Sequence, residues 1–309
     1  MKDYKTPKSL QPGSTIGVIA PASAAKRKPT KLGIEYLKKL GYRVVVSTHL
    51  NKGLKYLAAE DSIRLKHLEN FIMNPEIDGI ICLRGGYGLL RIIDKFDYTK
   101  IQTIKPKIFV GYSDLTALQL SLLHKCGWVT YSGPMVASEM GNEFSQFSEN
   151  WLWKVLTLNK GELNFQNPEN DPVKIFNPGQ GEGNLIGGCF SLITPLLGTE
   201  YIPDMAGNIL FLEEVGEPAY KIDKMLQTLK LHNVFDKISG LVIGKFTGSF
   251  KDEDKKNFSL VELLNDTISK INFPIITNFA YGHVKHRFTM PVGGKFRIDT
   301  EKQEYIYFK

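Results

Sequence analysis

Apolar and polar positions along the first half of the chain follow two different patterns. Continuous apolar runs, typical of strands buried on both faces, occupy residues 15–20, 43–47, 77–83 and 107–110. Between and after these runs, apolar residues recur at helical spacing over residues 29–40, 59–73 and 115–126. Strands that alternate with helices of this length indicate βαβ units. The pattern therefore predicts an α/β fold with a mostly parallel sheet flanked by helices.

The pattern changes near residue 159. Residues 159–183 are rich in Asn, Pro, Gly and Gln, which favours a linker into a second domain. Beyond it we expect helix 188–197, strand 208–212, helix 219–231, strand 240–244, an exposed charged loop 251–257, helix 260–271, and closing strands 296–299 and 304–308. We predict an N-terminal α/β domain, residues 1–160, and a smaller C-terminal α/β domain, residues 161–309, with a strand-rich end.

Composition restricts the possible functions. The 309 residues are 42% hydrophobic and 23% charged, enough apolar sequence for a sizeable core. The net charge of +7 is scattered, which favours a solvated basic surface and no nucleic-acid partner. No apolar run is long enough for a signal peptide or a membrane span, so we expect a cytoplasmic protein without a membrane partner. The three cysteines lack disulfide or metal-site spacing and are expected as buried thiols.

Three unusual segments follow predicted strands of the first half. They are Pro-Ala-Ser at residues 21–23, Arg-Gly-Gly-Tyr-Gly at residues 84–88, and Gly-Tyr-Ser-Asp at residues 111–114. In an open parallel sheet, ligands bind outside the carboxyl ends of the strands. We therefore expect the three segments to meet at one edge of the sheet and to form a site there.

Ser113 lies between a predicted strand and a predicted helix. A sharp turn there can project its Oγ as a nucleophile, with the Asp114 amide facing a developing oxyanion. The segment matches the G-x-S-x-G motif incompletely, because Leu115 stands where the last Gly would be. The alternative is that Ser113 or Asp114 only caps the helix.

Glycines at residues 85–88 can bring the backbone close to a ligand or supply a second oxyanion donor. A structural tight turn is the alternative. Neither a G-x-G-x-x-G fingerprint nor a P-loop Lys-Ser or Lys-Thr pair is present in this segment, so a nucleotide site is disfavoured.

A serine nucleophile needs a base and an orienting acid. His283 and His286 lie in a predicted loop, where functional histidines are common, whereas the other four histidines fall in or beside predicted elements. An H-x-x-H metal pair is the alternative, but no carboxylate ligand is near in sequence. Glu213 ends an apolar strand and is a candidate partner for a histidine; a solvated loop acid suits Glu214 and Glu217 better.

Taken together, these segments resemble the LD-carboxypeptidase family, which includes murein tetrapeptide carboxypeptidases and microcin C immunity peptidases. The resemblance covers nearly the whole chain. It rests on residues 84–88 and 111–114 and on Ser-Gly-Pro-Met at 132–135, Leu-Glu-Glu at 212–214 and Gly-His at 282–283. It implies two domains with the site between them, a homodimer, and neither metal nor cofactor.

Residue by residue, the resemblance implies that Ser113 is the nucleophile, Glu213 the charge-relay acid and His283 the base. The backbone amides of Asp114 and of Gly86, or of its neighbour Gly85, would form the oxyanion hole. The implied activity is removal of a terminal D-alanine from a murein-derived peptide, with Arg84 pairing with the terminal carboxylate; a structural ion pair is the alternative for Arg84.

Two other functions stay open: the same triad acting on a peptidyl nucleotide or another short peptide, and a non-catalytic ligand-binding protein. The sequence departs from the family at Cys189, where Asn is frequent, which leaves the role of this position open.

Overall fold

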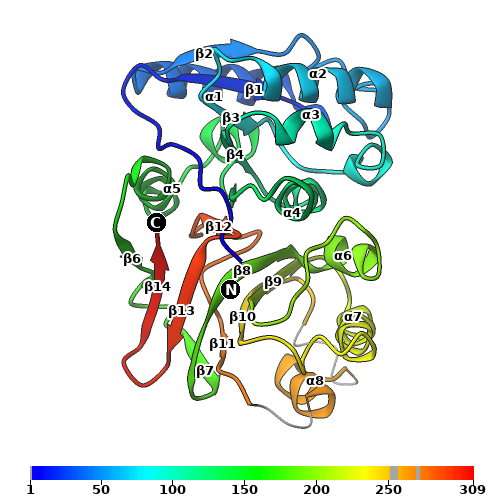
Figure 1. The fold of residues 1–309 in the computed structure, drawn as a ribbon, viewed down its shortest axis with the longest axis vertical. Coiled ribbons are helices and arrows are strands. Elements are labelled where there is room, and N and C mark those ends of the chain that lie inside the picture. Colours follow the sequence, from blue (N-terminus) through cyan, green and yellow to red (C-terminus); the bar gives the residue numbers. More distant parts are fainter. Residues whose placement is uncertain (1, 251–256, 269–271) are drawn as a thin grey trace.

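Two β-sheets organise the chain in the computed structural model, which describes residues 2–250, 257–268 and 272–309 (Figure 1). The first sheet has the order β12-β5-β4-β3-β1-β2. Its strands are β1 (Thr15–Ile19), β2 (Arg43–Val46), β3 (Gly79–Cys82), β4 (Ile108–Gly111), β5 (Thr130–Ser132) and β12 (Met290–Val292). The first five are parallel, and β12 is an antiparallel edge strand. The expected mostly parallel sheet is confirmed.

Helices cover this sheet. The spacing predicts α1 (Arg27–Lys39), α2 (Asp61–Met73) and α4 (Leu115–Cys126), but not the short α3 (Tyr98–Gln102). Every residue of β1, β3 and β4 is buried, which explains their continuous apolar sequences. The opposite edge strand, β2, is largely exposed.

Helix α4 joins the two halves of the molecule. Nearly all its residues are buried, as expected for a helix that is apolar on all sides. Its Thr116 Oγ1 accepts a hydrogen bond from the Cys189 amide (3.1 Å), and its Ser121 Oγ donates to the Tyr201 carbonyl (3.3 Å). Gly127, in the left-handed region at φ 69°, ends the helix as predicted.

The second sheet has the order β6-β14-β13-β8-β9-β10-β11-β7. Its strands are β6 (Glu162–Asn164), β7 (Lys174–Asn177), β8 (Gln180–Cys189), β9 (Ile209–Val215), β10 (Gly240–Thr247), β11 (Ile275–Thr277), β13 (Lys295–Asp299) and β14 (Glu304–Phe308). Strands β8 to β11 are mutually parallel, and the outer strands are antiparallel. The chain is therefore α/β in both halves.

The structure corrects two expectations in this half. The segment 159–183, interpreted as a linker, contributes β6, β7 and the start of β8, because its short strands pair with partners distant in sequence. The helix expected at 188–197 begins later: β8 continues to Cys189 alongside β9, and only α6 (Phe190–Ile193) and the 3-10 turn η3 (Thr194–Leu196) are helical.

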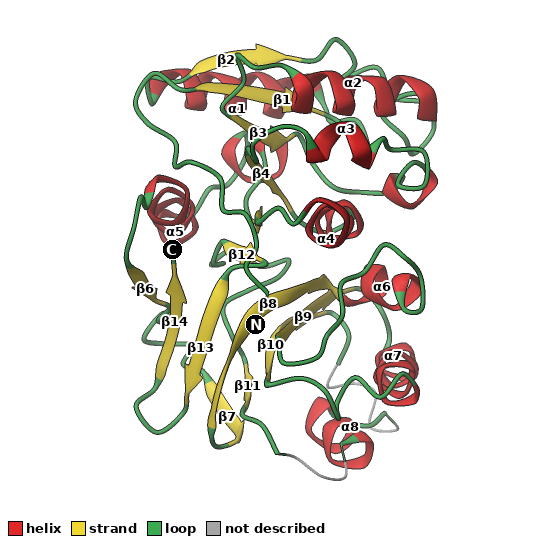
Figure 2. Ribbon diagram, viewed as in Figure 1, coloured by secondary structure: helices red, strands yellow, loops and turns green. Residues whose placement is uncertain are grey.

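The remaining helices are α5 (Gln146–Thr157), α7 (Ala219–Leu231) and α8 (Leu260–Thr267). Figure 2 shows α6, α7 and α8 gathered beside the second sheet. Helix α7 has the predicted bounds. Helix α8 ends before the predicted residue 271, which lies outside the described residues, as does most of the expected loop 251–257. We did not anticipate α5, whose first turn is capped by the Ser145 side chain.

Chain segments cross between the two halves of the molecule. Strand β12 follows the second sheet's central strands in sequence but pairs with β5 of the first sheet. In the other direction, the Lys2 carbonyl accepts a hydrogen bond from Asn184 of β8 (3.0 Å). The division at residue 160 stays a prediction. Within the described ranges, no helix is both long and apolar enough to cross a membrane.

Candidate active site

The three segments singled out in the sequence meet at the carboxyl edge of the first sheet. The Ser23 amide donates to the Gly85 carbonyl (3.4 Å), and the Ser23 Oγ accepts from the Tyr87 amide (3.2 Å). A Cβ placed on Gly85 would lie 2.9 Å from the Ser113 Cβ, so the glycine permits this close approach. The expected convergence is confirmed.

A buried arginine that the sequence analysis did not identify holds two of these segments together. The Arg64 guanidinium donates to the carbonyls of Pro21 and Gly88 and forms an ion pair with Asp61 (2.6 Å). These contacts satisfy a charge whose burial would otherwise be costly. Nothing in the sequence pattern distinguishes Arg64 from the other charged residues of α2.

Ser113 occupies a strained turn between β4 and α4. Its φ of 64° lies in the left-handed region, which is unfavourable by roughly 1–2 kcal/mol for a residue with a Cβ. Such strain at a strand-to-helix turn is a feature of nucleophile elbows. Because the side chain is only partly buried, the turn leaves Ser113 accessible to a substrate.

Asp114 begins α4, but its side chain makes no capping bond to that helix. Its carboxylate instead accepts a hydrogen bond from the Leu89 amide (3.0 Å). Burial raises the pKa of this carboxyl to about 6. The alternative that Asp114 only caps the helix is therefore wrong: the side chain anchors the glycine-rich segment, and the amide remains available at the helix N-terminus.

Glu213 and His283 form a partly buried pair. The distance between His283 Nδ1 and Glu213 Oε2 is 2.8 Å, and the His283 amide donates to the same oxygen (3.2 Å). Glu213 is fully buried on β9, whereas 20% of the His283 side chain is exposed. Gly282 has φ 128°, and a Cβ there would lie 3.0 Å from Glu213 Oε2, so a glycine is required for this approach.

Tyr112 connects this pair to Ser113. The Tyr112 ring lies edge-on to the His283 ring with their centroids 4.9 Å apart, and Ser113 is the next residue. Among the described residues, no direct hydrogen bond joins Ser113 Oγ to His283. Catalytic hydrogen bonds of this kind are often long before substrate binds.

The interpretation of Glu214 as a solvated loop acid is wrong. Strand β9 continues to Val215, so Glu214 is 2% exposed and accepts hydrogen bonds from the amides of Ser191 (2.7 Å) and Val215 (2.9 Å). Burial raises the pKa of its carboxyl. The buried Cys189 thiol lies 3.7 Å from both Glu214 oxygens. Glu217 is half-buried and pairs with Lys221 (2.8 Å).

Gly86 and Arg84 flank the site. Gly86 has φ 115°, and a Cβ there would lie 2.2 Å from the Ser23 Oγ, so only glycine fits. The Arg84 side chain is exposed and makes no ion pair within the described part of the chain, which argues against a purely structural pair. His286 is exposed and packs against Phe147, at 6.0 Å between ring centroids.

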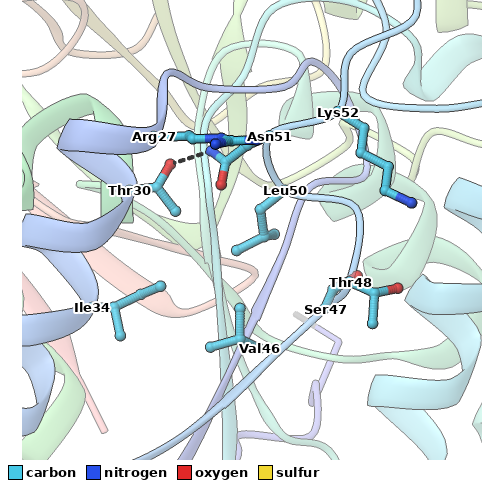
Figure 3. A pocket seen from close by; sticks show the side chains of 9 residues that line it. All are labelled: Arg27, Thr30, Ile34, Val46, Ser47, Thr48, Leu50, Asn51 and Lys52. Carbon is cyan, nitrogen blue, oxygen red and sulfur yellow. Dashed lines mark hydrogen bonds between the residues drawn. The ribbon is translucent and has the colours of Figure 1, made fainter.

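No group of three or more potential metal ligands occurs among the described residues. A separate depression of about 530 Å³ lies between α1 and the segment after β2 (Figure 3). Arg27 and Lys52 line it, and at its rim Asn51 Nδ2 donates to Thr30 Oγ1 (2.8 Å). None of the residues predicted for the active site lines this depression.

Comparisons with known proteins identify the family of this chain. The family model of the LD-carboxypeptidase N-terminal domain matches residues 16–133, and that of the C-terminal domain matches residues 182–298. A probable murein peptide carboxypeptidase of Bacillus subtilis is 33% identical over 98% of this chain and 94% of its own length. The microcin C7 self-immunity protein MccF of Escherichia coli is 27% identical over 95% of this chain and 93% of its own.

Solved structures show the same relationship. Wild-type MccF without ligand superimposes with a TM-score of 0.91 at 25% identity over 98% of both chains. A muramoyltetrapeptide carboxypeptidase from Oxalobacter formigenes superimposes with a TM-score of 0.83 at 28% identity over 95% of this chain and 98% of its own. The chain therefore belongs to the LD-carboxypeptidase family and is a hydrolase of the carboxypeptidase class.

Proposed function

We propose that this protein is a serine carboxypeptidase that removes the terminal D-alanine from murein-derived tetrapeptides, with Ser113, His283 and Glu213 as its catalytic triad. The observation that carries the proposal is the pair between His283 Nδ1 and Glu213 Oε2 at 2.8 Å, which lies beside the strained Tyr112–Ser113 turn. This arrangement provides the base, the orienting acid and the nucleophile that acyl transfer needs.

The proposed reaction has two steps. His283 accepts the Ser113 hydroxyl proton as Oγ attacks the carbonyl of the L-configured diamino acid, and the Asp114 and Gly86 amides stabilise the oxyanion. The C–N bond then breaks, His283 returns the proton to the leaving amine, and D-alanine departs. Water activated by His283 hydrolyses the acyl-enzyme and regenerates Ser113. Glu213 stabilises the imidazolium in both steps.

Arg84 is the proposed partner of the substrate's terminal carboxylate. A guanidinium can form two parallel hydrogen bonds to a carboxylate. The Arg84 Nη2 lies 3.8 Å from the position that a Cβ on Gly86 would occupy, so its charge is close to the proposed oxyanion donor. A carboxypeptidase must bind a terminal carboxylate near the scissile carbonyl, because only one residue separates the two.

The test is mass spectrometry of a murein tetrapeptide after incubation with the protein. Loss of one alanine by wild type, and no loss with Ser113→Ala, is the expected result. A fluorophosphonate probe should also label wild type and not Ser113→Ala. Absence of both turnover and labelling in wild type would indicate a non-catalytic ligand-binding protein and would overturn the proposal.

A second candidate is cleavage of a peptidyl nucleotide by the same triad. Similarity to MccF supports this alternative: MccF superimposes with a TM-score of 0.91 and has been solved in complex with aspartyl sulfamoyl adenosine. Parallel kcat/KM measurements on a tetrapeptide and on an aminoacyl-adenylate analogue separate the two. A higher kcat/KM on the nucleotide compound would replace the murein substrate.

We further propose that the protein acts in the cytoplasm as a homodimer. All three cysteines are free and buried, which suits a reducing compartment. Light scattering coupled to size-exclusion chromatography tests the assembly, and a mass equal to one chain, 34.8 kDa, would contradict it. Fractionation of the source cells tests the location.

A further inference from the structure

A buried ion pair that the proposed reaction does not use lies beside the triad. Arg287 is 6% exposed, and its Nη2 lies 3.2 Å from Oε1 of Glu139, which is 7% exposed. Glu139 belongs to the π-helical turn η2 (Val136–Met140) after the first sheet, whereas Arg287 follows the loop that carries His283. Burying two charges is unfavourable unless further hydrogen bonds satisfy them. The other contacts of Arg287 and Glu139 therefore show which segments this pair holds together.

The Arg287 side chain is hydrogen-bonded to the loop that carries His283. Its Nε donates to the Val284 carbonyl (3.0 Å), and its backbone amide donates to the Ser148 Oγ (2.9 Å). Val284 directly follows His283. The guanidinium is therefore fixed to the same backbone segment that positions the base.

The Glu139 carboxylate is hydrogen-bonded to the residue that precedes the proposed nucleophile. Its Oε1 accepts from the Tyr112 hydroxyl (2.8 Å), and its Oε2 accepts from the Met135 amide (2.8 Å). The Arg287 guanidinium also lies over the Tyr112 ring, 4.3 Å from the ring centroid, in a favourable cation–π arrangement. Tyr112 immediately precedes Ser113, and its ring lies against the His283 ring.

We propose that Arg287, Glu139 and Tyr112 act together as a positioning unit that sets the placement of His283 relative to Ser113. The proposal rests on the assignment of Ser113 and His283 above. Residues 282–288 belong to no helix or strand. Glu213 binds the His283 ring and amide, and the hydroxyls of Ser145 and Ser148 donate to the Lys285 carbonyl two residues further on, but none of these contacts involves the segment that carries Ser113. The positioning unit adds a restraint that runs through that segment. A misplacement of about 1 Å at such a site can cost about 100-fold in rate.

Tyr112→Phe tests this most cleanly, because it removes one hydroxyl and keeps the ring against His283. We expect kcat on the proposed substrate, or on whichever peptide the enzyme turns over, to fall about 10- to 100-fold, with KM within about twofold of wild type. The rate of fluorophosphonate labelling, which depends on the reactivity of Ser113, should fall in parallel. Arg287→Lys keeps the charge but loses the planar contacts, and should show the same pattern.

Tyr36→Phe is the matched control. The Tyr36 hydroxyl also donates to a glutamate, Glu149, at 2.6 Å, but this pair joins α1 to α5 and touches none of the proposed triad residues. The Tyr36→Phe variant should have a lower free energy of unfolding than wild type but the same kcat and labelling rate. The double variant Tyr112→Phe/Arg287→Lys should lose less activity than the product of the single losses, as residues that act as a unit do.

The proposal is overturned if Tyr112→Phe, folded by circular dichroism, keeps both kcat and the labelling rate within about twofold of wild type. If Arg287→Lys yields no folded protein, the Tyr112→Phe result decides alone. Failure of the proposed function is recognised separately, because wild type would then show neither turnover nor labelling that depends on Ser113.

Discussion

Replacement of Glu213 by glutamine separates the charge of the proposed acid from its geometry. In wild type, two donors of His283, the ring Nδ1 and the backbone amide, share Glu213 Oε2. The other oxygen, Oε1, is buried and has no hydrogen-bond partner among the described residues. The glutamine side chain should therefore place its oxygen toward His283 and its amino group where Oε1 was, because the reverse orientation would set donor against donor twice.

The orientation of the ring is then retained, and the loss comes from charge alone. A unit charge about 4 Å from the imidazolium contributes up to about 4 kcal/mol at an effective dielectric constant near 20. A hydrogen bond to a charged group exceeds a neutral one by roughly 1–2 kcal/mol. At 1.36 kcal/mol per factor of ten, we expect kcat to fall about 10- to 1,000-fold. Glu213→Ala also removes the orientation and should approach the roughly 10⁴-fold loss typical of a missing triad acid.

The assay is kcat/KM for alanine release together with urea unfolding of each variant. Glu213→Gln should also lower the free energy of unfolding by about 1–3 kcal/mol, because the buried amino group lacks a partner. Glu214→Gln is the matched control: this acid is equally buried on the same strand but bonds to the Ser191 and Val215 amides instead. It should lose stability while kcat stays within about threefold of wild type.

Two results would refute this reasoning. If Glu213→Gln keeps kcat within about threefold of wild type, the carboxylate does not stabilise an imidazolium. If Glu214→Gln is inactive while Glu213→Gln is active, the acid has been assigned to the wrong residue.

Four further predictions follow from other parts of the structure. Because Ser113 has φ 64°, Ser113→Gly should be more stable than Ser113→Ala by about 1 kcal/mol in urea unfolding, with both inactive; equal stabilities would argue against strain at this turn. Amidation of the substrate's terminal carboxylate, or a change of the terminal D-alanine to L-alanine, should lower kcat/KM of wild type about 10- to 100-fold. The Arg84→Gln variant should no longer prefer the free acid over the amide. If this variant keeps the full preference, Arg84 is not the partner of the carboxylate. Burial raises the pKa of the Asp114 carboxyl from 3.8 to about 6, so the folded state binds this proton more tightly than the unfolded state, and the stabilisation is lost as pH rises from about 4 to about 6. The free energy of unfolding of wild type should therefore fall over this pH range relative to that of Asp114→Asn. A constant difference between the two proteins would contradict the raised pKa of Asp114. EDTA should leave the rate unchanged, since no metal-ligand group of three occurs within the described ranges; activity lost with EDTA and restored by zinc would instead implicate the histidines of residues 283–286.

The sequence determined the local structure of the first half and pointed to the residues of the candidate site. Residues 15–20 and 107–110 are apolar without interruption because both faces of those strands are covered, and this pattern depends only on burial. The glycine-rich segment 84–88 and the turn at Ser113 could be located because backbone close approach and sharp turns demand particular residue types. These motifs could be placed at one edge because parallel strands all end on the same side of a sheet.

The tertiary structure decided what depends on partners distant in sequence. The sequence pattern predicts a loop position for Glu214, but pairing with β10 extends β9 past this residue and buries its side chain. The segment 159–183 lacks a strong strand pattern, and its strands exist because β11, β13 and β14 provide their hydrogen-bond partners. Arg287 and Glu139 are 148 positions apart in the printed sequence, and neither shows a periodicity or a motif that points to the other. Their contact, and with it the restraint between Tyr112 and His283, arises only when the chain brings β12 back to the first sheet, because an ion pair is specified by position in space and leaves no local pattern in the sequence.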